Sequence, residues 1–199
     1  MHKGLFLGVN GLTVVGWHVI MVFLSVCPPA WGKQHFYTQR TAICYESADD
    51  LEEFDQKLRF MPPAHFLEIY FRQVEPAPTS SLGNLAAKID GLLAAVCRLL
   101  RLRPQTFPRL HIILLKDGYQ VQLRHRLFQP SPARPFLGYG HLLAFYESGH
   151  HTIFLSLADF HEGVLAHEMT HHLLCTAYQP PPPAQIQEAW ASYVEAHLK

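Results

Sequence analysis

The sequence predicts an α+β fold in which a small, mainly antiparallel sheet packs on helices. Short runs of β-branched and aromatic residues, which are typical of strands, occur in three parts of the chain. Longer segments between them place apolar residues at helical spacing. The 199 residues are 49% hydrophobic and 16% charged, so one globular domain can bury a core without disulfides or metals.

The first 32 residues are expected to form an N-terminal signal peptide or membrane anchor, followed by one domain over residues 33–199. No charged residue occurs from Leu5 to Val26, and a helix of that length would reach roughly 33 Å. Asn10, Thr13, His18 and three glycines interrupt this run, which favours a cleaved export signal over a permanent span. The small-x-small sequence Ala30-Trp31-Gly32 favours cleavage after Gly32.

Two other fates of this segment stay open. Leu24-Ser25-Val26-Cys27 resembles a lipoprotein box, although Val26 is unfavourable before the cysteine. Retention would anchor the chain in a membrane through residues 5–26. In each case we expect an exported protein of the periplasm or cell envelope. Cleavage would leave three cysteines, for which we expect one disulfide and one free thiol: Cys44, Cys97 and Cys175.

The first half of the domain gives five local signals. Residues 34–46 are rich in aromatic and β-branched residues and are expected to form one strand. Ser47 and Asp50 form a capping pair for a helix that ends before Pro62-Pro63. Residues 72–81 are expected to form a loop, and residues 82–100 an amphipathic helix. The apolar run 110–115 predicts a buried strand.

In the second half, a short helix is expected over residues 119–128. Residues 140–146 and 152–157 flank the turn-forming Glu147-Ser148-Gly149-His150, which indicates an antiparallel hairpin. The run Pro180-Pro181-Pro182-Pro183 is expected to be a stiff spacer, and a last helix begins near Ala184 or Gln185. Phe154, Phe160 and Trp190 are expected in the core.

The hairpin leads directly to a metal-binding motif. His167-Glu168-Met169-Thr170-His171 is an HExxH sequence, and residues i and i+4 share one face of a helix, so that both imidazoles can bind one zinc ion. Zinc held by three protein groups keeps a position for water, and a neighbouring carboxylate can accept the proton of that water. Glu168 is the candidate base. Uncharged residues flank the motif, so the helix can pack on a sheet.

The motif is followed by the proline run and then by Glu188-Ala189-Trp190-Ala191-Ser192-Tyr193. HExxH with such a downstream E-x-x-A-x-Y helix resembles the gluzincin peptidases, particularly their compact peptidase-MA-like domains. The resemblance covers residues from about 140 to the C-terminus and implies a zincin-like fold. It implies Zn²⁺ held by His167, His171 and Glu188, with Glu168 as base and Thr152 to Leu157 as the preceding strand.

Two departures from that family bear on activity. Ala189 stands where many members have glycine, and only 11 residues follow Glu188. The region from which larger members draw an oxyanion-stabilising Tyr or His is therefore missing, which leaves Tyr178, Tyr193 and His172 as weak substitutes. Glu195 is a candidate to orient a ligand imidazole, whereas the other histidines near the motif are expected to be ordinary surface residues: His141, His150, His151 and His161.

The resemblance implies zinc-dependent peptide-bond hydrolysis in the cell envelope, with Glu168 activating a zinc-bound water. One alternative is a catalytically inactive zinc-binding interaction protein of the same fold, and another is an envelope protein whose HExxH is accidental. The formal net charge is zero, so no basic field exists to attract nucleic acid. The expected partner is a peptide or protein substrate, with membrane association through the N-terminal segment only.

Overall fold

The computed structural model of the chain describes residues 34–73, 81–103, 107–128 and 142–198. The N-terminal segment, His141 and most of the expected 72–81 loop lie outside this part. Within the described ranges, no helix is both long and apolar enough to cross a bilayer. The elements, in chain order, are β1 (Gln34–Tyr37), β2 (Thr41–Tyr45), α1 (Ala48–Lys57), α2 (Ala64–Gln73), α3 (Ser81–Leu99), β3 (Leu110–Leu115), α4 (Gly118–Phe128), β4 (Ala144–Glu147), β5 (Thr152–Ser156), α5 (Glu162–Ala177) and α6 (Ala184–His197).

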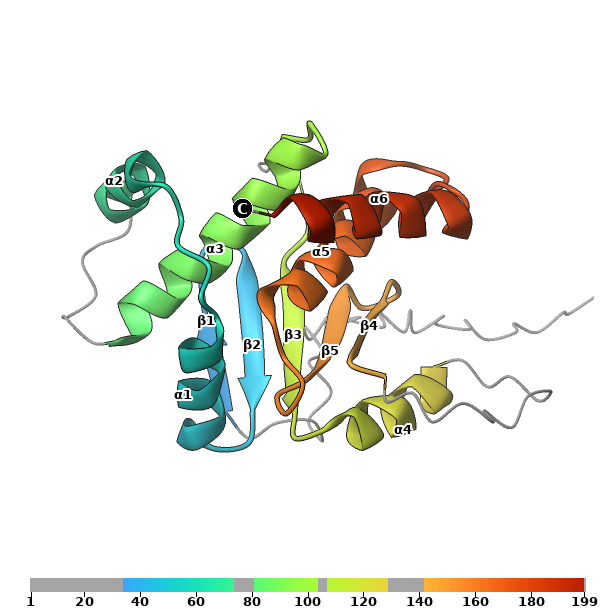
Figure 1. Cartoon of the computed structure of the whole chain (residues 1–199), viewed down its shortest axis with the longest axis horizontal. Coiled ribbons are helices and arrows are strands. Elements are labelled where there is room, and N and C mark those ends of the chain that lie inside the picture. The colour runs from blue at the N-terminus through green and yellow to red at the C-terminus, as the bar shows by residue number, and fades with distance from the viewer. Residues whose placement is uncertain (1–33, 74–80, 104–106, 129–141, 199) are drawn as a thin grey trace, which may run out of the picture.

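The five strands form one sheet in the order β1-β2-β3-β5-β4 (Figure 1). β1 and β4 pair with their neighbours in antiparallel orientation, whereas β2–β3 and β3–β5 are parallel. The α+β class is confirmed, but the expectation of a mainly antiparallel sheet is wrong, because the sheet is mixed. The chain passes from β2 to β3 through α1, α2 and α3, and from β3 to β5 through α4 and β4, because parallel strands need a crossover connection.

The strand predicted over residues 34–46 is two strands joined by a tight turn. The turn is held by Thr38, whose hydroxyl accepts hydrogen bonds from the backbone N–H groups of Arg40 and Thr41. The Thr38 hydroxyl donates to Asp90 of α3 over 2.7 Å, and the Gln39 N–H donates to the same carboxylate. A contact 52 residues away along the chain thus fixes the reversal.

Most other element predictions are confirmed. Ser47 caps α1 in a reciprocal arrangement with Asp50, as the capping pair predicts. α3, β3, α4, the β4–β5 hairpin and α6 lie where expected. α2 was not predicted. Phe154 and Phe160 are buried, but Trp190 is 43% exposed, so its expected place in the core is wrong.

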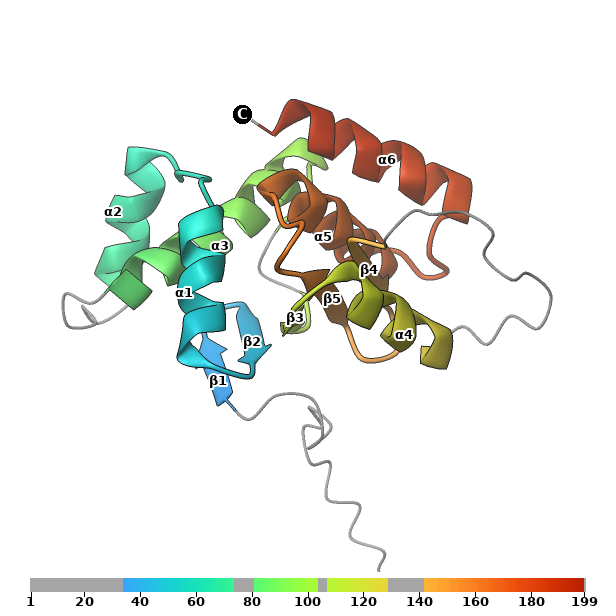
Figure 2. The ribbon, with the colours of Figure 1, turned by 60° about the horizontal axis from the view of Figure 1, so that its bottom comes forward.

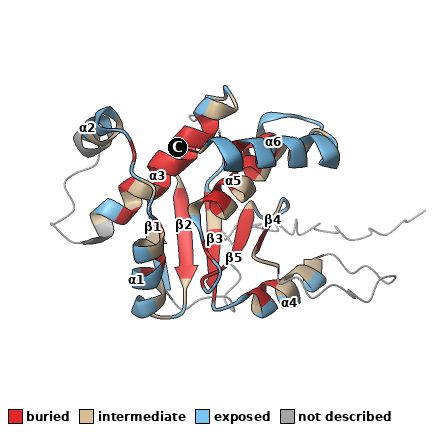
Figure 3. Ribbon diagram, viewed as in Figure 1, coloured by how far each residue is buried: buried red, intermediate tan, exposed pale blue. Residues whose placement is uncertain are grey.

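Both faces of the sheet are covered by helices. Alternate residues of β2, β3 and β5 point to a main core formed with α1, α3, α5 and α6, among them Ile43, Ile112 and Ile153. The intervening residues form a smaller core under α4, including Ile113 and Phe154. Figure 2 shows α4 on the side of the sheet away from α3 and α5, and Figure 3 shows α6 as largely exposed.

The three cysteines of the domain are free thiols, so the expected disulfide is wrong. Cys44 faces the smaller core, whereas Cys97 on α3 belongs to the main core on the other face of the sheet. Burial raises the pKa of the Cys97 thiol to about 12, which keeps it protonated and unreactive. Cys175 lies on α5, near Gln187 of α6.

Candidate metal centre

The structure brings the three predicted ligands together between α5 and α6. The Nε2 atom of His167 lies 3.4 Å from one carboxylate oxygen of Glu188, and the Nε2 atom of His171 lies 3.5 Å from the other. The candidate ligand atoms of all three residues lie within 4.8 Å of one another. Helix α5 supplies both imidazoles from one face, as the HExxH spacing predicts, and α6 carries Glu188 to them.

These distances suit zinc. Zinc–ligand bonds of roughly 2.0–2.1 Å at tetrahedral angles separate two ligand atoms by about 3.4 Å. The side-chain exposures are 21% for His167 and 14% for His171, against 61% for Glu188. The two imidazoles are therefore held in the protein, while the carboxylate closes the site from the solvent side.

Each imidazole is oriented by a hydrogen bond from its other nitrogen. Nδ1 of His167 lies 3.2 Å from a carboxylate oxygen of Glu195, and Nδ1 of His171 lies 3.2 Å from Oε1 of Gln187. A proton on each Nδ1, donated to these oxygens, leaves the Nε2 lone pairs directed at the Glu188 carboxylate. Three acceptor groups then converge with no proton between them, which is the arrangement a cation would satisfy.

The ionisation of His171 agrees with this arrangement. Burial is the main cause that holds the pKa of the His171 imidazole below its ordinary value, with the hydrogen bond that His171 donates to Gln187 and the charge of Glu188 acting against it. The ring is thus neutral near pH 7, the form that can bind a metal.

Two features of the chain place the orienting groups. Gly163 lies one helical turn before His167, and a Cβ atom there would lie 3.2 Å from Cγ of Glu195, so the missing side chain makes room for Glu195. Gln187 donates from Nε2 to the Pro182 carbonyl over 2.8 Å. The proline run is thereby linked to the site. Glu195 was predicted as a second-layer candidate, whereas Gln187 was missed, although it directly precedes Glu188.

Glu168 occupies a different environment from the ligands. It is partly buried beside β4, and desolvation raises the pKa of its carboxyl to about 8, with smaller contributions from the negative charges of Glu188 and Glu195. A hydrogen bond from the backbone N–H of Tyr146 acts in the opposite direction. Such a group can both hold and release a proton near neutral pH. The Tyr146 backbone was not predicted, because a backbone donor leaves no sequence signal.

A cleft of about 570 Å³ opens over these groups. The cleft is lined by His167, Glu168, His171 and Glu188. Further lining residues come from α4, β4, the β4–β5 turn, α5 and the start of α6, including His125, Ala144, Phe145, Tyr146, Ser148, Cys175 and Gln187. β4 is the outermost strand of the described sheet on this side. Leu143 accepts a hydrogen bond from the Ser156 N–H, so the alternation of backbone groups turns those of Ala144 and Tyr146 away from β5.

The weak oxyanion candidates lie elsewhere. His172 is 1% exposed and its Nδ1 lies 3.3 Å from the Tyr146 hydroxyl, which also lies 3.1 Å from Nδ1 of His151. Tyr193 lies on the outer side of α6, along another groove. Tyr178 is exposed at the end of α5 and does not line the cleft.

The remaining described histidines near the motif do not join the cluster. The His161 side chain accepts a hydrogen bond from the Val164 N–H and caps α5. His150 is exposed and pairs with Glu147 over 2.7 Å. His151 was expected at the surface but is part of the buried Tyr146–His172 network. No protein-family model, curated protein or solved structure matches the chain.

Proposed function

We propose that this protein is a zinc-dependent peptidase with a zincin-like domain, in which His167, His171 and Glu188 hold the metal. The observation that carries the proposal is the convergence of two Nε2 atoms and one carboxylate beside Glu168. HExxH spacing alone gives two histidines on one helix face. Here the third group and an orienting partner for each imidazole are present as well.

Zinc at this position would polarise a substrate carbonyl and lower the pKa of water. The chain's own contribution is proton transfer. Glu168 accepts the proton of the attacking water and passes it to the leaving amine, a role that its place in the cleft suits. The Tyr146 N–H holds the Glu168 carboxylate in position by a hydrogen bond.

A peptide is the substrate that the cleft favours. The backbone groups of Ala144 and Tyr146 turn away from β5 along the rim, and an outermost strand can pair with an extended peptide. The Tyr146 N–H is already used by Glu168, which leaves the neighbouring backbone groups for a substrate. The proposed setting is the cell envelope, which rests on the export signal predicted from the sequence, and mass spectrometry of the mature N-terminus tests that part.

A catalytically inactive zinc-binding protein is the second candidate. It is favoured by one observation: none of Tyr178, Tyr193 and His172, the predicted oxyanion donors, lines the cleft. Among the side chains that line the cleft, His125 and Ser148 could donate a hydrogen bond to a developing oxyanion.

The decisive variant is Glu168→Gln, which keeps the shape of the side chain and removes the base. We expect the full chain to bind one zinc, and Glu168→Gln to retain it while losing roughly 10²-fold or more of its activity on a diverse peptide library. Glu162→Gln on the same helix is the control for loss of a carboxylate. Glu188→Ala is expected to weaken zinc binding.

The outcomes separate the candidates. Stoichiometric zinc without Glu168-dependent cleavage would sink the peptidase proposal and leave the inactive zinc-binding protein. Absence of zinc from the purified native protein would end both and favour an accidental HExxH.

A further inference from the structure

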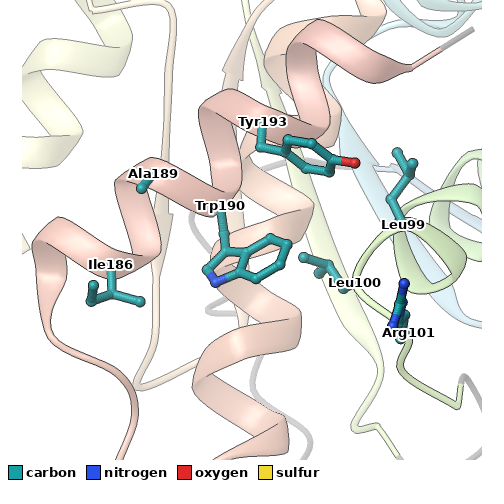
Figure 4. A pocket seen from close by; sticks show the side chains of 7 residues that line it. All are labelled: Leu99, Leu100, Arg101, Ile186, Ala189, Trp190 and Tyr193. Atoms are coloured by element: carbon teal, nitrogen blue, oxygen red, sulfur yellow. The ribbon is translucent and has the colours of Figure 1, made fainter.

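A second groove lies on the side of α6 away from the metal centre. It runs between α6 and the C-terminal end of α3 and encloses about 540 Å³, a size typical of ligand sites. Figure 4 shows the Trp190 ring extending from α6 toward Leu100, with Tyr193 and Leu99 at one end and Ile186 at the other. Its lining residues are Leu99, Leu100, Arg101, Ile186, Ala189, Trp190 and Tyr193.

α6 presents two apolar faces, of which only one is buried. Ala191 and Val194 are buried. Ile186, Trp190 and Tyr193 follow one another at helical spacing on the other face and are 49%, 43% and 42% exposed. Trp190 and Tyr193 meet edge to face at 5.7 Å between ring centres. The two rings thus support each other while staying exposed. Exposed aromatic residues in a concave site are typical of interaction surfaces.

The floor of the groove is fixed by the core. Leu99 and Leu100 pack against the main hydrophobic core. The helix end is closed by a hydrogen bond from the Leu102 N–H to the Cys97 carbonyl over 2.8 Å. The groove therefore needs no rearrangement of α3 to accept a ligand.

Arg101 lies at the rim in an unusual conformation. Its φ is 56°, in the left-handed region that ends many helices, where glycine is the favoured residue because it lacks a Cβ atom. The chain instead places an exposed guanidinium beside the apolar groove. Backbone strain of this kind persists where the side chain has a use. Among the described residues, no carboxylate forms an ion pair with Arg101.

We propose that the α3–α6 groove binds a peptide segment of a partner protein that carries two or three bulky apolar side chains and a flanking carboxylate. The apolar side chains fill the space over Leu99, Leu100 and Trp190, and the carboxylate pairs with the Arg101 guanidinium. Charge complementarity selects this occupant over the chain's own residues 5–26, which carry no charge. The proposal goes beyond the peptidase function, because the groove lies outside the catalytic cleft.

The test uses the full chain and an array of synthetic 12-residue peptides. Each peptide has two Leu or Phe residues at varied spacing and flanks of Asp/Glu, Lys or Ser. Acid-flanked peptides are expected to bind best, and Trp190→Ala is expected to reduce their binding affinity by roughly tenfold or more. Tyr119→Ala, which removes an exposed aromatic residue of α4, is the matched control and is expected to leave binding unchanged.

Charge reversal tests the specific pairing. Arg101→Glu is expected to weaken the binding of acid-flanked peptides and to strengthen the binding of Lys-flanked peptides. Arg101→Gly separates an effect on binding from an effect on folding. Glycine adopts the left-handed backbone conformation without strain, so this variant should fold well. Because it lacks the guanidinium, it should no longer prefer peptides with acidic flanks. Binding that is indifferent to both the flanks and Arg101 would overturn the proposal.

Three further results would also overturn it. One is the absence of any peptide whose binding depends on Trp190. Another is Trp190-dependent binding to phosphatidylglycerol vesicles with no peptide binding, which would assign the groove to a lipid surface. The third is a concentration-dependent dimer that Trp190→Ala disrupts, which would assign it to a second copy of the chain. Zinc content and Glu168-dependent cleavage are measured on the same variants, so failure here is distinct from failure of the peptidase proposal.

Discussion

The Glu195 carboxylate lies 3.2 Å from Nδ1 of His167, reaching across from α6 to α5. Gln187 has the same relationship to His171. Both oxygens accept a hydrogen bond from the nitrogen that faces away from the metal position. They therefore fix the tautomer and the ring orientation that direct Nε2 at Glu188.

The first prediction concerns these two orienting residues. Glu195→Ala and Gln187→Ala are each expected to weaken zinc binding by about 10- to 100-fold, because the ligand rings lose their fixed orientation. Competition with a chromophoric chelator measures the affinity. Glu195→Gln keeps an acceptor oxygen and should recover part of the loss. Unchanged affinity in both alanine variants would mean that these hydrogen bonds do not support the site.

The second prediction concerns the close approach at Gly163. A Cβ atom there would lie 3.2 Å from Cγ of Glu195 and 3.1 Å from Nδ1 of His161. Gly163→Ala should therefore displace Glu195 and lower zinc affinity in the direction of Glu195→Ala, although alanine favours a helix by up to about 1 kcal/mol. If Gly163→Ala lowers zinc affinity only by displacing Glu195, the double variant Gly163→Ala/Glu195→Ala should have the same zinc affinity as Glu195→Ala. Additive losses would contradict the coupling.

The third prediction concerns the pH dependence of the metal-free protein. The pKa of Glu168 is about 8 in the folded state because of desolvation, against an ordinary value of 4.5. Between these values the folded state binds a proton that the unfolded state releases, so this group lowers stability as pH rises from 4.5 to 8. Glu168→Gln should gain stability relative to the wild type over that range, by a few kcal/mol at pH 8 and above.

Urea unfolding with EDTA at pH 5 and pH 8.5 measures this difference. Glu52→Gln, which removes an exposed carboxylate from α1, controls for the loss of a charge. A Glu168→Gln variant whose stability follows that of the wild type at both pH values would show that the carboxyl ionises as it does in water.

Local chemistry explains which features could be predicted from the sequence. The two histidines of HExxH meet because residues four apart share a helix face. The capping of α1 by Ser47 depends on Asp50, which is three residues away. The turn at Thr38 depends on a contact with the distant Asp90 of α3. Strand propensity carries no information about that contact, so the sequence predicted one strand where the structure has β1 and β2. The parallel pairing of β2 with β3 is likewise decided by packing across the whole domain.

The candidate metal centre also combines residues that the sequence could predict with contacts that it could not. Glu188 could be predicted because the resemblance supplied a spacing pattern. The Tyr146 N–H that contacts Glu168 is a backbone group, and any residue at position 146 would offer it. The number of cysteines in the domain predicted one disulfide and one free thiol. In the structure, however, Cys44 and Cys97 lie on opposite faces of the sheet. A count carries no information about which face a side chain occupies.

The last prediction concerns the buried network behind the site. The hydroxyl of Tyr146 lies within hydrogen-bond distance of Nδ1 of both His151 and His172, and the Pro108 carbonyl accepts a hydrogen bond from His172. Every group is satisfied if His151 donates to Tyr146, Tyr146 donates to His172, and His172 donates to Pro108. This arrangement requires His172 to be neutral.

Desolvation is the main cause that lowers the pKa of His172 from 6.5 to about 4. Between these values the unfolded state binds a proton that the folded state does not, so stability is fully present above pH 6.5 and is lost as pH falls toward 4. The loss is on the order of 3 kcal/mol. His172→Gln, which cannot titrate, should be less stable at pH 7.5 but lose less stability on acidification to pH 4.5, as measured by urea unfolding with EDTA. His65→Gln, which removes an exposed imidazole from α2, is the control, and an acid dependence in His172→Gln equal to that of the wild type would place the acid-sensitive group elsewhere.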